Sequence, residues 1–181
     1  MASGTRYLAL IRGINVGGKN LIKMAELREG VEALGFRDVS TYIASGNVIF
    51  RAPRSRANEL ARQLEAGLAN RFGLTLKMLV LTESQVRAVV EEAPEGFGAE
   101  DHSCDVIFLF EPLTPKRALA VIEIKEGVDQ AWAGSRVVYH SRLTARASSS
   151  RISKVVAEPE YQDMTLRSWR TAQKLAGLLD N

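Results

Sequence analysis

The order of periodic segments in the first 81 residues constrains the fold more than any other feature. Runs typical of strands occupy 7–11, 39–43, 47–52 and 74–81. Apolar residues recur with helical spacing at 24–34 and again at 60–72, and Gly35 and Gly73 follow as helix stops. The order strand, helix, strand, strand, helix, strand is typical of a ferredoxin-like α+β fold.

The second half contains the same kinds of segment with a polar stretch before them. Thr82 to Gln85 form a capping box, which predicts a helix over 82–93. Residues 95–103 read as a linker. Beyond it we expect strands at 104–110 and 136–141, helices at 116–124 and near 147–150, and a last helix that Thr165 caps. This pattern predicts an N-terminal subdomain, 1–94, and a C-terminal α+β subdomain, 95–181.

Length and cysteine content set outer limits on the protein class. A chain of 181 residues suits one domain or two small subdomains. The longest apolar run near the start, Tyr7–Ile11, is too short for a secretion signal or a membrane span, so we expect a cytoplasmic protein that contacts no membrane. Cys104 is the single cysteine, and with His102 and His140 it offers too few ligands for a metal site.

Charge is distributed unevenly along the chain. Residues 1–81 hold 12 Lys/Arg and 6 Asp/Glu, a net of +6, whereas residues 82–134 hold 4 and 11, a net of −7. Residues 135–181 hold 8 and 4, a net of +4. The two basic ends either share a surface that meets an anion or pair with the acidic middle.

A glycine-rich segment, Gly13 to Asn20, falls one residue short of the P-loop pattern. Asn20 stands where that pattern needs Ser or Thr for magnesium. The following helix begins only near Met24, whereas a P-loop helix starts at the Gly-Lys itself, and the strand order predicts hairpins instead of a parallel sheet. These features argue against a P-loop NTPase.

Anion binding without P-loop chemistry fits the same segment. In a ferredoxin-like sheet the first two strands run parallel, so the glycine loop and the turn at Ser45 leave from the same edge. A helix N-terminus, glycine amides and Lys19 favour a phosphate or a carboxylate there. The alternative is that both segments are plain turns. The candidate ligand-binding residues are Arg12, Gly13, Asn15, Gly17, Gly18, Lys19, Asn20, Ser45, Gly46, Asn47, Arg167 and Arg170.

Several motifs together resemble an uncharacterised family. The runs are Tyr7 to Asn20, Lys23 to Leu27, Leu34 to Phe36 and Thr41 to Phe50, and they look like the domain-of-unknown-function family 1697. The resemblance implies two ferredoxin-like subdomains. It implies no known activity, substrate or cofactor.

The C-terminal segment is similar to the family pattern Thr-x-Arg-Asn-Trp-x-Thr, with Ser168 in place of the asparagine. That replacement puts any role for the amide in doubt. On a helix that begins at Thr165, Arg167 and Arg170 would lie away from the apolar stripe, which consists of Trp169, Ala172, Ala176 and Leu179. They form either a solvated basic face or one site with the glycine loop.

Three function hypotheses remain open from the sequence. The protein binds a phosphate-bearing ligand, a nucleotide or nucleic acid, at the glycine loop. Alternatively it is a small-molecule enzyme at the same edge, with Ser45 or Asn47 polarising a substrate, or it is a structural or partner-binding protein with no ligand. Nothing in the sequence requires a cofactor.

Overall fold

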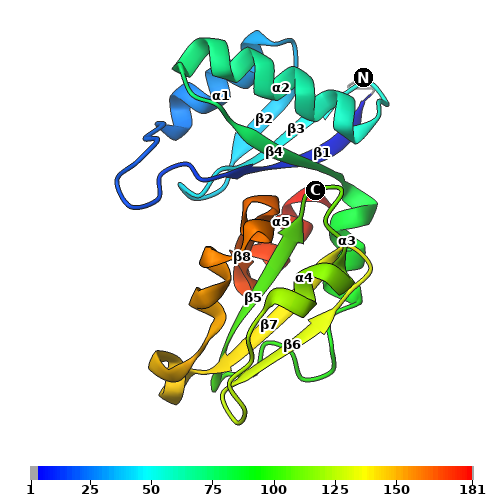
Figure 1. Cartoon of the computed structure of the whole chain (residues 1–181). Coiled ribbons are helices and arrows are strands. Elements are labelled where there is room, and N and C mark those ends of the chain that lie inside the picture. The colour runs from blue at the N-terminus through cyan, green and yellow to red at the C-terminus, as the bar shows by residue number, and fades with distance from the viewer. Residues whose placement is uncertain (1–3, 181) are drawn as a thin grey trace. The chain divides into compact units, whose positions relative to one another are not determined.

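The computed structural model describes residues 4–180 and divides the chain into two compact units. The first unit runs to Val86 and takes up the chain again from Leu175, and the second is Arg87–Lys174. The chain therefore passes between the units inside two helices, α3 (Glu83–Glu91) and α5 (Trp169–Leu179) (Figure 1). The contacts within the chain place the division between Val86 and Arg87, before the boundary that the sequence predicts after residue 94.

The first unit has the βαββαβ order that the sequence predicts. Its elements are β1 (Thr5–Arg12), α1 (Met24–Ala33), β2 (Arg37–Thr41), β3 (Asn47–Ala52), α2 (Ala57–Phe72) and β4 (Lys77–Thr82). The strands form one sheet in the order β2-β3-β1-β4, and every neighbouring pair is antiparallel. This is the strand order of the ferredoxin-like fold, and it excludes a parallel P-loop sheet.

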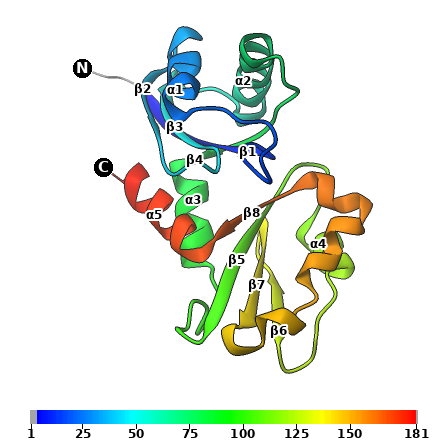
Figure 2. The ribbon, with the colours of Figure 1, turned by 90° about the vertical axis from the view of Figure 1, so that its left-hand side faces the viewer.

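Apolar packing of two helices on one sheet face holds the first unit together. Alternate residues of β1, such as Tyr7 and Ala9, join Leu27 of α1 and Leu64 of α2 in one buried cluster. Figure 2 shows α1 and α2 side by side over the sheet. A Cβ at Gly30 of α1 would lie 2.8 Å from a methyl carbon of Leu68, so the small residue permits the close approach of the helices.

The second unit repeats the strand order of the first. It contains β5 (His102–Leu109), α4 (Pro115–Val121), β6 (Asp129–Ala133), β7 (Val137–Leu143) and β8 (Met164–Ser168). The sheet order is β6-β7-β5-β8, again antiparallel throughout. Where the first unit has α2, this unit has three 3₁₀ helices, η1 (Thr144–Ser149), η2 (Ile152–Ala157) and η3 (Pro159–Asp163). The predicted α+β fold class is confirmed in both halves.

One face of the second sheet packs against α4 and η2. Ile107 and Val138 from the sheet meet Ala118 of α4 and Ile152 of η2 in a buried cluster. On the other face, Phe97 packs edge-on against the aromatic rings of Trp132, Tyr139 and Trp169, with ring centroids 5.1–6.0 Å apart. The polar stretch 95–103 is thus part of the second unit's packing as well as a connection.

The capping box before α3 forms as predicted. The Thr82 amide donates to Oε1 of Gln85 at 3.0 Å, and the Gln85 amide donates to Oγ1 of Thr82 at 3.3 Å. The helix ends at Glu91, two residues before the expected end.

The prediction for the last helix is wrong at its start. Residues 164–168 form β8, which pairs with β5, so Thr165 does not cap a helix and Arg167 lies on a strand. Ser168 caps α5 instead, because its Oγ accepts the Thr171 amide at 3.3 Å. Serine and asparagine are equally good N-caps, so the replacement of the family's asparagine keeps this role. Because β8 pairs with β5 up to Ser168, the helix begins later than the expected cap at Thr165.

Candidate functional site

The glycine segment forms a tight hairpin between β1 and α1. The Lys19 amide donates to the Val16 carbonyl at 3.0 Å, and Gly17 and Gly18 both have positive φ, 58° and 74°. Positive φ at both central residues is the geometry of a type I′ two-residue turn. The segment is therefore a projecting hairpin, whereas a P-loop wraps its amides around a phosphate.

Two asparagines hold this hairpin in place. The Asn15 side chain donates to the carbonyls of Ile22 and Ala44, at 3.0 and 2.9 Å, and accepts the Ile22 amide at 2.8 Å. Asn20 donates from Nδ2 to the Gly13 carbonyl at 3.0 Å. Asn15 thereby joins residues 13–23 to residues 42–46, and we call these two segments the loop pair. The sequence-based expectation that they lie at one sheet edge fits these contacts.

The turn between β2 and β3 has its own internal supports. Gly46 has φ 75°, and a Cβ there would lie 2.9 Å from Cβ of Ile11, so only glycine fits. Asn47 is fully buried, and its Nδ2 donates to the Tyr42 carbonyl at 2.9 Å. That burial favours a structural role for Asn47 over contact with a substrate. Ser45 lies beside Gly46 and is half-buried.

Exposed cations and apolar side chains share the loop pair. Lys19 and Lys23 are exposed, and Arg12 precedes the hairpin at the end of β1. Neither segment contains Asp or Glu. The loop pair also contributes three of the five large hydrophobic residues that stand out as exposed in the described chain, Val16, Leu21 and Ile43. Single exposed apolar residues are common, but three on adjoining loops are typical of a binding surface.

Ile43 occupies an unusual backbone conformation. Its φ is 50°, a region that β-branched residues almost never adopt, and the residue is 49% exposed. Strain of this kind costs on the order of 1–3 kcal/mol and clusters at functional sites. Packing does not require isoleucine here, since half of the residue faces solvent.

The two C-terminal arginines differ from each other. Arg167 is 7% exposed and donates to Oγ1 of Thr165 and to the Leu166 carbonyl, both at 2.8 Å. Burial lowers the pKa of Arg167 to about 10, which still leaves it charged near neutral pH. Arg170 is exposed on α5. Both belong to the second unit and the loop pair to the first, so a site shared with Lys19 remains a prediction.

A buried polar cluster in the second unit was not predicted. Asp129 of β6 accepts from Oγ of Ser150 at 2.5 Å, from the Arg151 amide at 2.9 Å and from the Lys125 amide at 3.0 Å. Nε2 of His140 lies 3.3 Å from its carboxylate. Burial alone would raise the pKa of Asp129, but these hydrogen bonds outweigh it and hold the pKa below its ordinary value.

The cluster does not have the order of a catalytic triad. Asp129 stands between Ser150 and His140, so the imidazole cannot take a proton from the serine. Its role is to tie η1 and η2 to the sheet. The serine-rich run before Arg151 is the one weak sequence signal for this cluster.

Two kinds of feature are absent from the described residues. Within residues 4–180, no group of three or more His, Cys, Asp or Glu side chains is placed to hold a metal ion. In the same range, no helix is long and apolar enough to span a bilayer.

The fold and the loop pair define an α+β protein with two four-stranded antiparallel sheets. The chain belongs to the family described as protein of unknown function (DUF1697), which matches residues 5–139. Among solved structures it is similar to SP0830, a conserved bacterial protein from Streptococcus pneumoniae, with 29% identity and a TM-score of 0.84. That match covers 97% of this chain and 98% of the other. No curated protein matches the chain.

Proposed function

We propose that the first unit binds a phosphate-bearing ligand at the loop pair, and that a single-stranded nucleic acid is the ligand that fits best. One observation carries the proposal: exposed cations and apolar side chains share two adjoining loops that contain no carboxylate. Lysine ammonium groups neutralise phosphates, and apolar side chains offer contact area to unstacked bases.

The form of the hairpin favours a single-stranded nucleic acid over a single nucleotide as the ligand. A projecting two-residue turn has no amide cradle for one phosphate group, since Lys19 uses its own amide to close the turn. A single-stranded nucleic acid carries a phosphate at every nucleotide, so it can contact Lys19 and Lys23 through different phosphates. Lys23 is available because its ion pair with Glu26 is long, 3.8 Å, and exposed.

Fluorescence anisotropy with a labelled single strand of about 12 nucleotides tests the proposal. Each lysine that contacts a phosphate contributes about 0.7 to the slope of log affinity against log salt. Lys19→Ala and Lys23→Ala should each weaken binding and reduce the slope by that amount. Lys116→Ala, an exposed lysine on α4, is the control and should change neither. The absence of binding at low salt, or an equal effect of Lys116→Ala, would contradict the proposal.

The contribution of the C-terminal arginines is tested by Arg170→Ala alone and with Lys19→Ala. If both basic ends contact the same single-stranded nucleic acid, Arg170→Ala should weaken binding. In the double variant with Lys19→Ala, the salt slope should then be lower than in Lys19→Ala alone. Unchanged affinity in Arg170→Ala would leave the loop pair as a separate site and α5 as a solvated face.

A further inference from the structure

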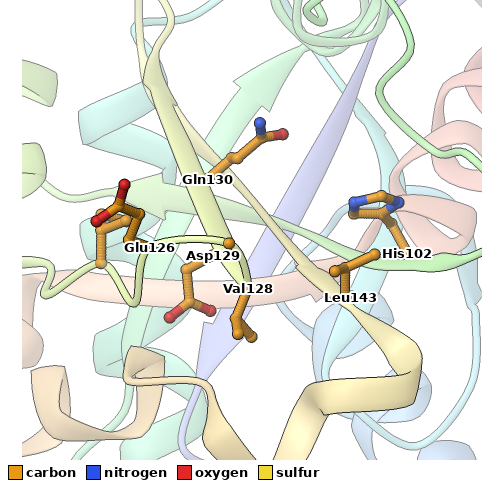
Figure 3. Close-up of a pocket in the computed structure, with 8 residues that line it drawn as sticks. His102, Glu126, Val128, Asp129, Gln130 and Leu143 are labelled. Carbon is orange, nitrogen blue, oxygen red and sulfur yellow. The ribbon is translucent and has the colours of Figure 1, made fainter.

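The second unit contains a pocket of about 430 Å³ at one end of its sheet. The lining comes from the start of β5, the end of β7, the start of β6 and the loop before β6. The residues are His102, Ile124, Glu126, Gly127, Val128, Asp129, Gln130 and Leu143. Figure 3 shows the His102 ring beside Leu143 at one end, Glu126 at the other, and the Gln130 side chain between them.

His102 is held in one orientation by its neighbour. Nδ1 of His102 lies 2.7 Å from Oδ1 of Asp101, and this bond is the main cause that lowers the pKa of the Asp101 carboxyl. Because a carboxylate only accepts, the bond places the proton of a neutral imidazole on Nδ1. The backbone fixes the pair, since the Thr144 amide donates to the Asp101 carbonyl at 2.9 Å and β5 pairs His102 with Leu143. Nε2 then offers its lone pair.

On the opposite side of the pocket, internal hydrogen bonds hold the loop before β6 in place. The amides of Val128 and Asp129 donate to the Lys125 carbonyl at 2.9 and 2.8 Å, which closes the loop before β6. The buried Asp129 carboxylate accepts a hydrogen bond from the Lys125 amide and so anchors this loop. The loop holds Ile124 partly exposed, at 41%, beside the polar side chain of Glu126.

The polar groups of the pocket are mainly hydrogen-bond acceptors. Nε2 of His102, the Glu126 carboxylate and the Gln130 amide oxygen all accept, and one of them is negative. Ile124, Val128 and Leu143 supply apolar surface. A cation, Arg146, is close to Gly127, with Nη1 3.8 Å from the place of a Cβ, so a positive ligand group fits best toward the His102 and Gln130 side.

We propose that this pocket binds a small primary amine, an ammonium group on a short aliphatic chain. The ammonium group donates to Nε2 of His102 and to the Gln130 oxygen, and the chain packs on the apolar wall. The Glu126 carboxylate, at the other end of the pocket, favours a positive ligand through its longer-range charge. All residues that line this pocket belong to the second unit, so the site is separate from the loop pair.

The chain has only two histidines, which makes NMR of the imidazole Cε1–H signals a direct test. The probe is n-butylamine, with n-butanol and butyrate as neutral and negative controls of similar shape. The amine should shift the His102 signal saturably, with a dissociation constant on the order of 1 mM, while the two controls do not. The fully buried His140 is the internal reference and should stay unchanged.

Variants separate the roles of the lining residues. Glu126→Gln should weaken amine binding roughly threefold, while Glu158→Gln, an exposed acid on the same unit, leaves it unchanged. Asp101→Asn should change the imidazole ¹⁵N shifts, which report the tautomer, in addition to weakening binding. Equal shifts with butanol and butylamine, or no saturable shift at His102 with His140 unperturbed, would overturn the proposal.

Discussion

The two units have one strand order but different means of covering their sheets. In the first, two α-helices bury apolar side chains such as Leu27 and Leu64. In the second, the short helix α4 and the 3₁₀ helix η2 pack on the corresponding face. The carboxylate of Asp129 fixes η1 and η2 through Ser150 and Arg151. The comparison shows that a ferredoxin-like sheet can replace a helix with a polar anchor, and it predicts different sensitivities in the two units.

The largest expected effect is on the polar anchor. Asp129→Ala removes the acceptor of three strong hydrogen bonds and should lower the free energy of unfolding by about 4 kcal/mol. Hydrogen exchange should rise first in the amides of η1 and η2. Glu158→Ala is the control and should stay within about 0.5 kcal/mol of the wild type in urea denaturation. A similarly small loss for Asp129→Ala would mean that apolar packing alone holds η1 and η2.

The matching change in the first unit is Leu64→Ala. Leu64 is 1% exposed, and its truncation should cost about 3 kcal/mol through lost burial and a cavity. Gln63→Ala, its exposed neighbour on α2, should change stability by less than about 0.5 kcal/mol. The loss should be the same at different pH values. A strongly pH-dependent loss would show that the first unit also relies on charged groups.

A smaller effect concerns how the stability of the protein changes at acidic pH. Burial lowers the pKa of His140 below its ordinary value of 6.5, although Asp129 and Asp105 oppose this, and Arg142 also faces it. The unfolded chain therefore takes up a proton on His140 before the folded chain does. This contribution to stability is present above pH 6.5 and is lost as the pH falls toward the lower folded pKa.

Urea denaturation at about pH 7 and about pH 5 checks this effect. The wild type should lose stability over this range, and His140→Gln should lose less. Asp129 adds a second loss below its ordinary pKa of 3.8, where its lowered folded pKa is approached. Asp105 acts in the opposite sense, because burial raises its pKa and its contribution falls as pH rises. A steeper acid loss in His140→Gln would contradict this assignment.

The smallest predicted change is a gain. Ile43→Asn places a residue that tolerates positive φ at a strained and exposed position, so stability should rise by about 1 kcal/mol. Leu21→Asn, at an exposed residue of the loop pair whose φ is not positive, should give no gain. If Ile43 serves binding, the stabilised variant should also bind the single strand less tightly. A loss of stability in Ile43→Asn would show that the residue makes necessary contacts.

Local sequence signals predicted the first unit better than the second. The repeat from Met24 and the capping box at Thr82 depend on neighbours in the chain, and both appear as expected. β8 was missed because its partner β5 lies far away in the sequence. β6 was missed although its partner β7 follows closely, because β6 is short and begins with the buried polar Asp129 instead of an alternating apolar pattern. Thr165 illustrates this: threonine is a good N-cap residue, but pairing with Phe108 makes Thr165 a strand residue.

The candidate sites divide in the same way. The glycine hairpin and the turn at Gly46 were identified because glycine and asparagine mark positive φ in sequence. The bonds that Asn15 makes to Ala44, and the three exposed apolar residues, need coordinates. The His102 pocket leaves no motif, since its lining comes from three separate segments of the chain, near residues 102, 124–130 and 143.

The most direct test of the account is a map of the single-strand contact by amide NMR. A saturating concentration of the single-stranded nucleic acid should shift the amide signals of Gly17, Gly18 and Lys19 and those of residues 42–46. We expect this because the loop pair is proposed to contact the nucleic acid. Lys19→Ala should reduce these shifts at equal strand concentration, and the amides around His102 should stay in place in both proteins. Saturable shifts confined to the second unit, with the loop pair unchanged, would contradict the proposed function.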